Sequence, residues 1–223
     1  MESKVEKGCF FLSAAISDAF KSGLFPERAK LEVYKELVFW RDQYKKLRIT
    51  HDPIRAAYIY QQEVDRSMEA YKKSKYGPQI KCAKGCSFCC YQHVSVSQDE
   101  AMLIREFLEE DKVSYNEQLM KAQLGKGEHE YKTLAFKDKR CMFLNDKGEC
   151  GIYEVRPCAC RKHVVLSDPK ECSVEEFPDG LVLKGLDVTS ELITSGMYNA
   201  TSGGSMADMV HKALQEKPIN NNQ

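Results

Sequence analysis

Four cysteines fall within the nine residues 82–90, at Cys82, Cys86, Cys89 and Cys90. Thiolates are soft ligands, and side chains at this spacing can converge on one metal ion or cluster. Gly85 permits a tight turn that would aim successive sulfurs at one centre. However, adjacent side chains rarely point the same way, so Cys89 and Cys90 can hardly both be simple ligands of one tetrahedral ion. Cys90 would serve a second metal, lie behind the ligands or belong to the core. The pattern predicts that this loop supplies part of a metal site.

Five more cysteines follow before residue 173, and these are Cys141, Cys150, Cys158, Cys160 and Cys172. The segment 145–148 is a strong turn signal between apolar runs, which predicts a hairpin with Cys150 opposite Phe143. Cys141 would then share a face with Cys150, and both sulfurs could reach one metal. Two buried cysteines beneath a hairpin remain the alternative. With this many thiols, the chain could hold two sites or one multinuclear cluster.

All-thiolate ligation suits both zinc and iron–sulfur clusters. Structural zinc sites favour two C-x2-C pairs, and this chain has no second one, so the spacing favours an iron–sulfur cluster and leaves zinc as the alternative. A disulfide framework or inert thiols are weaker readings. Cys-x3-Cys-x-aromatic-Cys, with Phe88 as the aromatic, also matches radical S-adenosylmethionine enzymes. The 133 residues after Cys90 show no strand–helix alternation, which argues against their barrel.

Two histidines and two arginines lie near the cysteines in sequence. His93 and His163 are candidate nitrogen ligands, although a lone histidine is more often a surface residue. Arg156 and Arg161 would offset the negative charge of several thiolates, and a salt bridge to Glu154 is the alternative. No glycine-rich phosphate loop, nucleophile elbow or paired-carboxylate motif supports hydrolase or kinase chemistry.

The elements that position these residues should be mostly helical. Apolar periodicity predicts amphipathic helices over 27–48 and 54–75, packed as a hairpin. The predicted apolar stripes consist of Leu31, Tyr34, Leu37, Val38, Phe39 and Leu47 on the first helix and Ala57, Tyr58, Val64, Met68 and Tyr71 on the second.

Serine-led signals mark the remaining elements. A short strand around Val94 and Val96 should precede a capping box, Ser97 to Glu100, which begins a helix to about residue 110. The signal recurs at Ser114 for a helix that Gly125 would stop. Residues 125–139 are expected to be a mobile loop, 181–183 a strand, and 201–204 a linker. Ser205 should cap a last helix to about 216.

Composition sets the class of protein. The 223 residues carry no net charge, so no nucleic-acid or membrane-surface partner is indicated. No apolar run approaches the roughly 18 residues of a membrane span. The short apolar run 9–16 is flanked by acidic residues, unlike a secretory signal. Ten cysteines are about 4.5% of the chain, below the roughly 8–10% of disulfide scaffolds. A reducing cytoplasm is therefore expected.

Two stretches together resemble the YkgJ-type cysteine-cluster proteins, whose CxxCxxCC domain is described as a putative zinc- or iron-chelating domain. The first is 82–101, with its cysteines, Val94-Ser-Val-Ser and Glu100-Ala101; the second is 141–161, ending in Arg156-Pro-Cys-Ala-Cys-Arg. The resemblance covers roughly residues 80–165. It implies a metal-binding set of Cys82, Cys86, Cys89, Cys90, Cys141, Cys150 and Cys160. The family usually has proline where this chain has Met142, and Cys158 and Cys172 lie outside its core pattern.

The sequence thus predicts an α+β fold, mostly helical, with a small β-hairpin and an irregular cysteine-rich core. Residues 1–76 would form a helical region, 77–175 the metal-binding domain and 176–223 a C-terminal extension packed on it. The predicted function is metal binding through clustered thiolates, with an iron–sulfur cluster favoured over zinc. A cluster-dependent redox or group-transfer enzyme is one alternative. A zinc-stapled interaction module, docking a protein partner through the N-terminal helices, is another.

Overall fold

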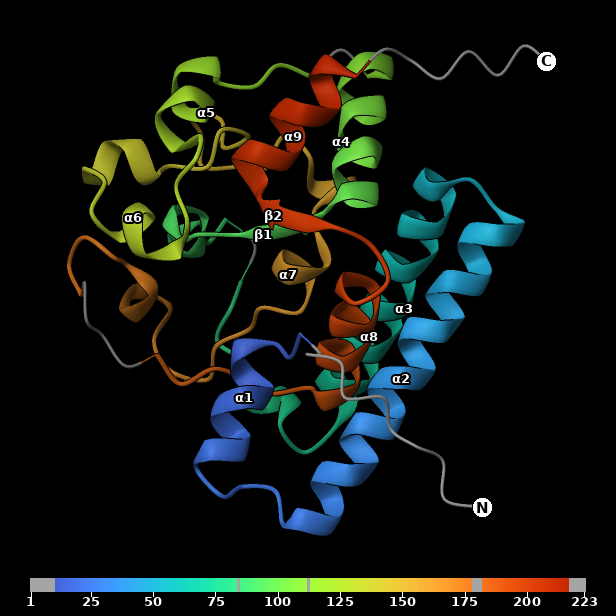
Figure 1. The fold of residues 1–223 in the computed structure, drawn as a ribbon. Helices are drawn as coiled ribbons and strands as arrows, with labels where there is room; N and C mark the ends of the chain where they lie inside the picture. Colours follow the sequence, from blue (N-terminus) through green and yellow to red (C-terminus); the bar gives the residue numbers. More distant parts are fainter. Residues whose placement is uncertain (1–10, 84, 112, 178–181, 217–223) are drawn as a thin grey trace.

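The computed structural model describes residues 11–83, 85–111, 113–177 and 182–216. It is mostly helical, with a two-stranded antiparallel sheet, as predicted (Figure 1). The elements are α1 (Ala14–Lys21), α2 (Glu27–Thr50), α3 (Pro53–Lys73), β1 (Ser95–Ser97), α4 (Gln98–Glu110), α5 (Glu117–Gln123), α6 (Glu128–Lys132), α7 (Cys158–Arg161), α8 (Val188–Tyr198), β2 (Gly203–Ser205) and α9 (Met206–Gln215). Short 3-10 helices are η1 (Gly77–Gln79), η2 (Phe88–Tyr91), η3 (Phe136–Lys139), η4 (Tyr153–Val155) and η5 (Pro169–Cys172).

The two long helices confirm the sequence prediction, but a third helix decides how they pack. α8 lies against both α2 and α3 (Figure 1), and its apolar side chains join Tyr44, Tyr60 and Val64 in one core cluster. The two helices approach closely at Gly196, where an added Cβ would lie 2.7 Å from the Trp40 Cβ. Threonine, serine and glycine have modest helix propensity, which is why the periodicity did not indicate α8.

The buried face of α2 differs from the predicted stripe. Val33, Leu37 and Tyr44 are buried, whereas Leu31 and Phe39 are 49% and 52% exposed. The stripe was drawn from hydrophobicity alone. α8 instead covers the row of residues that follows the 3.6-residue helical period through Leu37.

A strand pair links distant parts of the chain. β1 and β2 are antiparallel, with Ser95 opposite Ser205 and Ser97 opposite Gly203. The predicted linker at 201–204 is therefore wrong, because part of it forms β2. Each strand runs straight into a helix that its last serine caps: Ser97 begins α4 through the predicted capping box, and Ser205 begins α9. Both capping predictions are confirmed.

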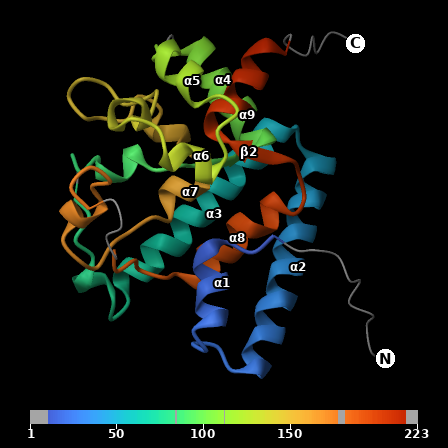
Figure 2. The ribbon, with the colours of Figure 1, turned by 60° about the vertical axis from the view of Figure 1, so that its left-hand side comes forward.

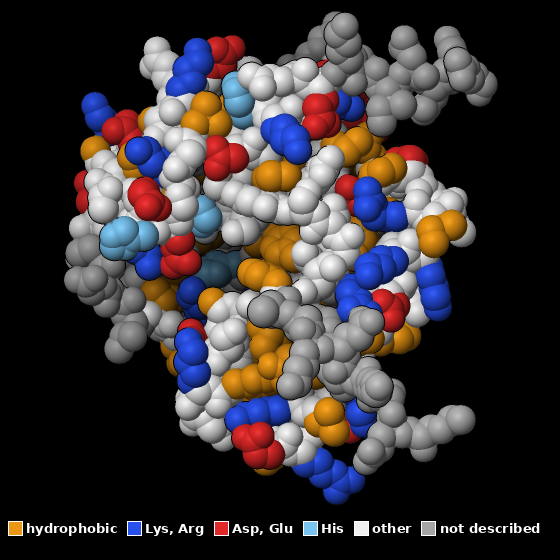
Figure 3. Space-filling view, in the orientation of Figure 1, with side chains coloured by type: hydrophobic (Ala, Val, Ile, Leu, Met, Phe, Trp, Pro, Cys, Tyr) orange, Lys and Arg blue, Asp and Glu red, His pale blue; other side chains and the backbone are white. Residues whose placement is uncertain are grey.

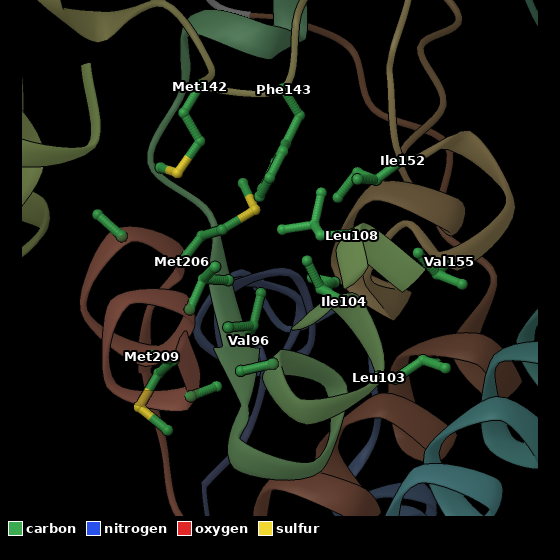
Figure 4. Close-up of a cluster of buried hydrophobic side chains, with 14 of the residues drawn as sticks. Val96, Leu103, Ile104, Leu108, Met142, Phe143, Ile152, Val155, Met206 and Met209 are labelled. Carbon is green, nitrogen blue, oxygen red and sulfur yellow. The ribbon is translucent and has the colours of Figure 1, made fainter. Parts of the chain in front are cut away.

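The second core lies between α4, α9 and the segment after Cys141. In Figure 4, Met142 and Phe143 point from that segment toward Ile104 and Met206, while Ile152 and Val155 close the side next to α4. Apolar side chains thus fix the backbone on either side of Cys141 and Cys150.

The predicted hairpin is reduced to a tight turn. A single antiparallel bridge pairs Cys150 with Leu144 rather than with Phe143, so the expected register is wrong by one residue. The turn is held locally, because the Asn145 side chain accepts hydrogen bonds from the amides of Lys147 and Glu149, each at 2.9 Å. Gly148 has a φ of 75°, which the turn requires.

Two other loop predictions need correction. Residues 125–139 contain α6 and η3 rather than only loop, since Tyr131 is buried and donates a 2.6 Å hydrogen bond to the Lys139 carbonyl. The expected strand at 181–183 is a bridge of Lys184 with Val165, and Leu181 lies outside the described residues. Residues 9 and 10 of the short apolar run 9–16 also lie outside the described residues. α1 begins at Ala14, within the described part of that run.

The surface carries mixed charges. On the face shown in Figure 3, acidic and basic side chains are interspersed, in keeping with the zero net charge. Within the described ranges, no helix is both long and apolar enough to cross a bilayer.

Candidate metal centre

The first cysteine loop, residues 82–90, is joined to the 141–150 turn. Gly85 adopts a φ of 88°, the left-handed conformation expected for the turn between Cys82 and Cys86. η2 then presents Cys89 and Cys90, and the Cys90 carbonyl accepts a 2.8 Å hydrogen bond from the Cys141 amide. This bond joins the loop to the 141–150 turn despite about fifty intervening residues.

Four sulfurs from these segments and α7 form what we call the inner group: Cys89, Cys141, Cys150 and Cys160. Burial raises the pKa of Cys141 to about 12, with the Cys150 and Cys89 thiols adding to the effect. Burial also raises the pKa of Cys160, and its further causes are the other three members of the group. Each thiol is thus within electrostatic range of its neighbours, although the four come from three separate stretches of sequence.

Cys89 contributes to the raised pKa of each of the other three thiols in the inner group. A hydrogen bond with the Cys90 side chain, followed by burial, raises its pKa. In this hydrogen bond one thiol donates and the other accepts. The prediction that Cys89 and Cys90 have different roles is consistent with this contact and stays a prediction. Cys90 also lies close enough to Tyr131 to contribute, after burial, to that phenol's raised pKa.

Backbone amides and one arginine favour the anionic form of the inner sulfurs. The amides of Phe143 and Leu144 lower the pKa of Cys141, and the Ile152 amide lowers that of Cys150. The Arg156 guanidinium acts in the same direction on Cys89, Cys150 and Cys160. In each case these donors oppose a larger rise, so the sulfurs are protonated at neutral pH unless a cation takes the proton's place.

Arg156 is positioned by a ring contact. Its guanidinium lies 4.3 Å from the centre of the Tyr153 ring, while its Nε atom is buried with no hydrogen-bond partner among the described residues. The predicted charge-offsetting role of Arg156 is consistent with this position and stays a prediction.

The remaining loop cysteines lie beside a different segment. We call Cys82, Cys86 and Cys172 the outer group. The Val165 amide donates a 3.3 Å hydrogen bond to the Cys82 sulfur. Burial raises the pKa of Cys172 to about 11, with Cys89, Cys82 and Cys86 as the neighbouring thiols that add to it.

Several predicted residues lie elsewhere. Cys158 is fully buried in the core beside Glu100, which raises its pKa after burial. Arg161 is held by a 2.5 Å ion pair with Asp65, by Gln61, and by the backbone carbonyls of Arg156 and Glu154. The alternative of a contact with Glu154 is thus met through its carbonyl oxygen. Arg161 has a structural network of its own, and its role at a metal site stays a prediction.

The two histidines have neighbours of other kinds. The His93 ring packs edge-on against Tyr131 at 5.4 Å. Burial, followed by Lys184 and Lys162, lowers the pKa of His163 to about 4. The Nε2 atoms of both rings are buried without hydrogen-bond partners in the described chain. Both are neutral bases at pH 7 with a nitrogen lone pair available, which is what a ligand needs, and both remain predictions.

Among the described residues, no three histidine, cysteine, aspartate or glutamate side chains are already grouped as ligands of a single ion. The donor set nevertheless fits a thiophilic metal: soft sulfurs, amides aimed at them, and Arg156 to balance charge.

The sequence identified Glu100 as a helix cap but gave no indication of its second contact, which organises the site. The Glu100 carboxylate, besides closing the capping box of α4, accepts a 2.7 Å hydrogen bond from the amide of Cys158, the first residue of α7. Its presence in the resemblance, as Glu100-Ala101, was the available signal. Glu100 thereby sets where α7, and with it Cys160, begins.

A helical protein with a cysteine-rich centre suited to a thiophilic metal is the class that this fold and site define. Residues 81–177 match the CxxCxxCC family, described as a putative zinc- or iron-chelating domain, so this segment carries that domain and the resemblance is confirmed there. The match extends past residue 165 and includes Cys172. Comparison with curated proteins and with solved structures gives no match.

Proposed function

We propose that this chain is an iron–sulfur protein that holds its cluster through the inner group. The observation that carries the proposal is that four partly buried cysteines from three segments lie within electrostatic range of one another, with backbone amides and Arg156 opposing the loss of their negative charge. A cluster bound there would supply electron transfer or a Lewis-acidic iron.

The spacing of the cysteines along the sequence supports a cluster over a single zinc ion. Cys82, Cys86 and Cys89 form one x3-x2 group, and the chain has no second C-x2-C pair of the kind that structural zinc sites use. Cysteines outside such pairs suit a cluster, in which each thiolate binds a different iron. Both metals require reduced thiols, so we also propose a cytoplasmic location.

The test is the metal content of the full chain purified without oxygen. We expect iron and acid-labile sulfide in the wild type, with visible sulfur-to-iron charge-transfer absorption. Cys141→Ser should lose most of both. Cys158→Ser is the matched control, since this buried cysteine lies outside both groups and a serine hydroxyl can still reach Glu100. Stoichiometric zinc without sulfide would replace the cluster by the zinc alternative, and a chain that retains neither metal would refute metal binding.

A further inference from the structure

We infer that the cleft between α3, α4 and η4 binds a linear organic polycation, of the class in which ammonium groups alternate with short aliphatic chains. The cleft has a volume of about 490 Å³, within the range of roughly 300–1,000 Å³ that is usual for small-molecule sites. α4 and α7 both pack on α3 around it (Figure 2). No described cysteine lines the cleft, so this site is separate from the inner and outer groups.

Negative charge dominates the lining of the cleft. The only guanidinium or ammonium group among its described lining residues is that of Arg161, which is already paired with Asp65. Four further carboxylates line the cleft without an ion-pair partner in the described chain. They are Glu106, Glu110, Asp111 and Glu154. An external cation is therefore what this surface lacks.

The end of α4 adds to this negative field. α4 ends at Glu110, inside the cleft lining, and has no basic residue in its last turn, so nothing there offsets the negative end of the helix dipole. One turn earlier, burial, followed by Glu110 and Asp52, raises the pKa of Glu106. Arg105 opposes this rise, but its Nη1 atom donates a hydrogen bond to the Ala213 carbonyl. A bound cation would stabilise the charged form of Glu106.

Two exposed tyrosine rings of the cleft are suited to a cation. Tyr58 lies on α3 and Tyr153 on η4, and they are 36% and 60% exposed. Each ring already has a guanidinium near it, with the Arg55 carbon 5.4 Å and the Arg156 carbon 4.3 Å from the ring centre. The electron-rich face of an aromatic ring attracts cations, and each ring has two faces.

The arrangement of the carboxylates favours an extended organic cation over a metal ion. A divalent metal ion needs several oxygen atoms around one point, and no three acidic, histidine or cysteine side chains of the described residues are grouped in that way. The carboxylates instead come from α3, the end of α4 and η4, and the lining also contains the apolar side chains of Leu103, Phe107 and Val155. A polyamine matches this lining, because methylene groups separate its charges.

The experiment is a calorimetric titration of the anaerobically purified full chain with spermidine at low ionic strength. We expect the double variant Glu106→Gln/Glu110→Gln to bind about tenfold more weakly, because each partly exposed charge pair contributes about a factor of three. Tyr58→Leu should weaken binding about threefold through the loss of one aromatic face. Glu109→Gln is the matched control, since Glu109 is on the same helix but does not line the cleft, and its affinity should stay within about twofold of the wild type.

Magnesium ions and putrescine, a shorter diamine, serve as competitors at equal ionic strength. We expect putrescine to displace spermidine and magnesium to fail. Equal displacement by the two would mean that the acidic surface only attracts counterions, which refutes the site. Equal affinities of the double variant and Glu109→Gln would also refute it, and an unchanged affinity of Tyr58→Leu would overturn the choice of an organic cation. These readouts do not depend on bound metal, so their failure leaves the iron–sulfur proposal standing.

Discussion

Replacing Glu100 by glutamine should destabilise the fold more than replacing Ser97, its partner in the capping box, by alanine. Glu100 is fully buried. One carboxylate oxygen accepts the Ser97 amide at 3.0 Å, and the other accepts the Cys158 amide at 2.7 Å. Glutamine keeps the shape but offers one acceptor oxygen, so its NH2 group must face one of those two amides. That amide becomes a buried donor without an acceptor.

The magnitude follows from this bond count. An orphaned buried donor costs about 1–3 kcal/mol, and the surviving hydrogen bond loses its charge assistance, worth about 1 kcal/mol more. We therefore expect Glu100→Gln to lower the free energy of unfolding by about 2–4 kcal/mol. Ser97→Ala removes only the capping hydroxyl, at a cost of about 1 kcal/mol, and leaves the Cys158 bond in place.

Urea unfolding of the two variants and the wild type, at matched metal content, measures the difference. A loss for Glu100→Gln no greater than that for Ser97→Ala would refute the reasoning. It would mean that relief from burying a carboxylate outweighs the lost hydrogen bonds.

Three further predictions concern packing and pH. Gly196→Ala should lower the melting temperature, because the new methyl group would lie within 2.8 Å of the Trp40 backbone. In an open helix the same change normally stabilises by about 0.5–1 kcal/mol, so a higher melting temperature would contradict the close approach of α8 to α2. His163 is neutral when folded, with a pKa of about 4, so the unfolded chain binds its proton first as the pH falls below about 6.5. Stability should therefore drop from about pH 6.5 to pH 4, and less so in His163→Asn; equal slopes in acid unfolding would argue against a buried neutral ring. Metal binding must release protons from thiols such as Cys141, whose pKa is about 12. Competition with a chelator should therefore show a metal affinity that rises about tenfold per pH unit for each proton released. A metal affinity that does not change with pH would mean that the bound sulfurs were already ionised.

Local sequence signals were enough to predict the helices whose apolar periodicity or capping residues lie within the helix itself. α2 and α3 follow from periodicity and from Asp52-Pro53 between them, where Asp52 caps α3. The Ser97–Glu100 capping box and the Ser205 cap are complete within four residues each, so no tertiary knowledge was needed.

Features that depend on distant partners could not be predicted in this way. β2 exists only because β1 pairs with it across about a hundred residues, and its glycine-rich sequence indicates a linker when taken alone. The buried face of α2 depends on where α8 packs. The division of the thiols into inner and outer groups depends on Val165 and Lys184, which carry no metal-binding signal themselves.

The β1–β2 pair has a consequence for the order of events during synthesis. The cysteines up to Cys172 leave the ribosome before Gly203–Ser205, the strand that pairs with β1. α9, which completes the core under Met142 and Phe143, is later still. Since chains emerge N-terminus first, all the thiols leave the ribosome before the 51 residues after Cys172 (223 − 172) can enclose them. Metal delivered to the nascent chain would meet an open set of ligands, and the C-terminal segment would close over it afterwards.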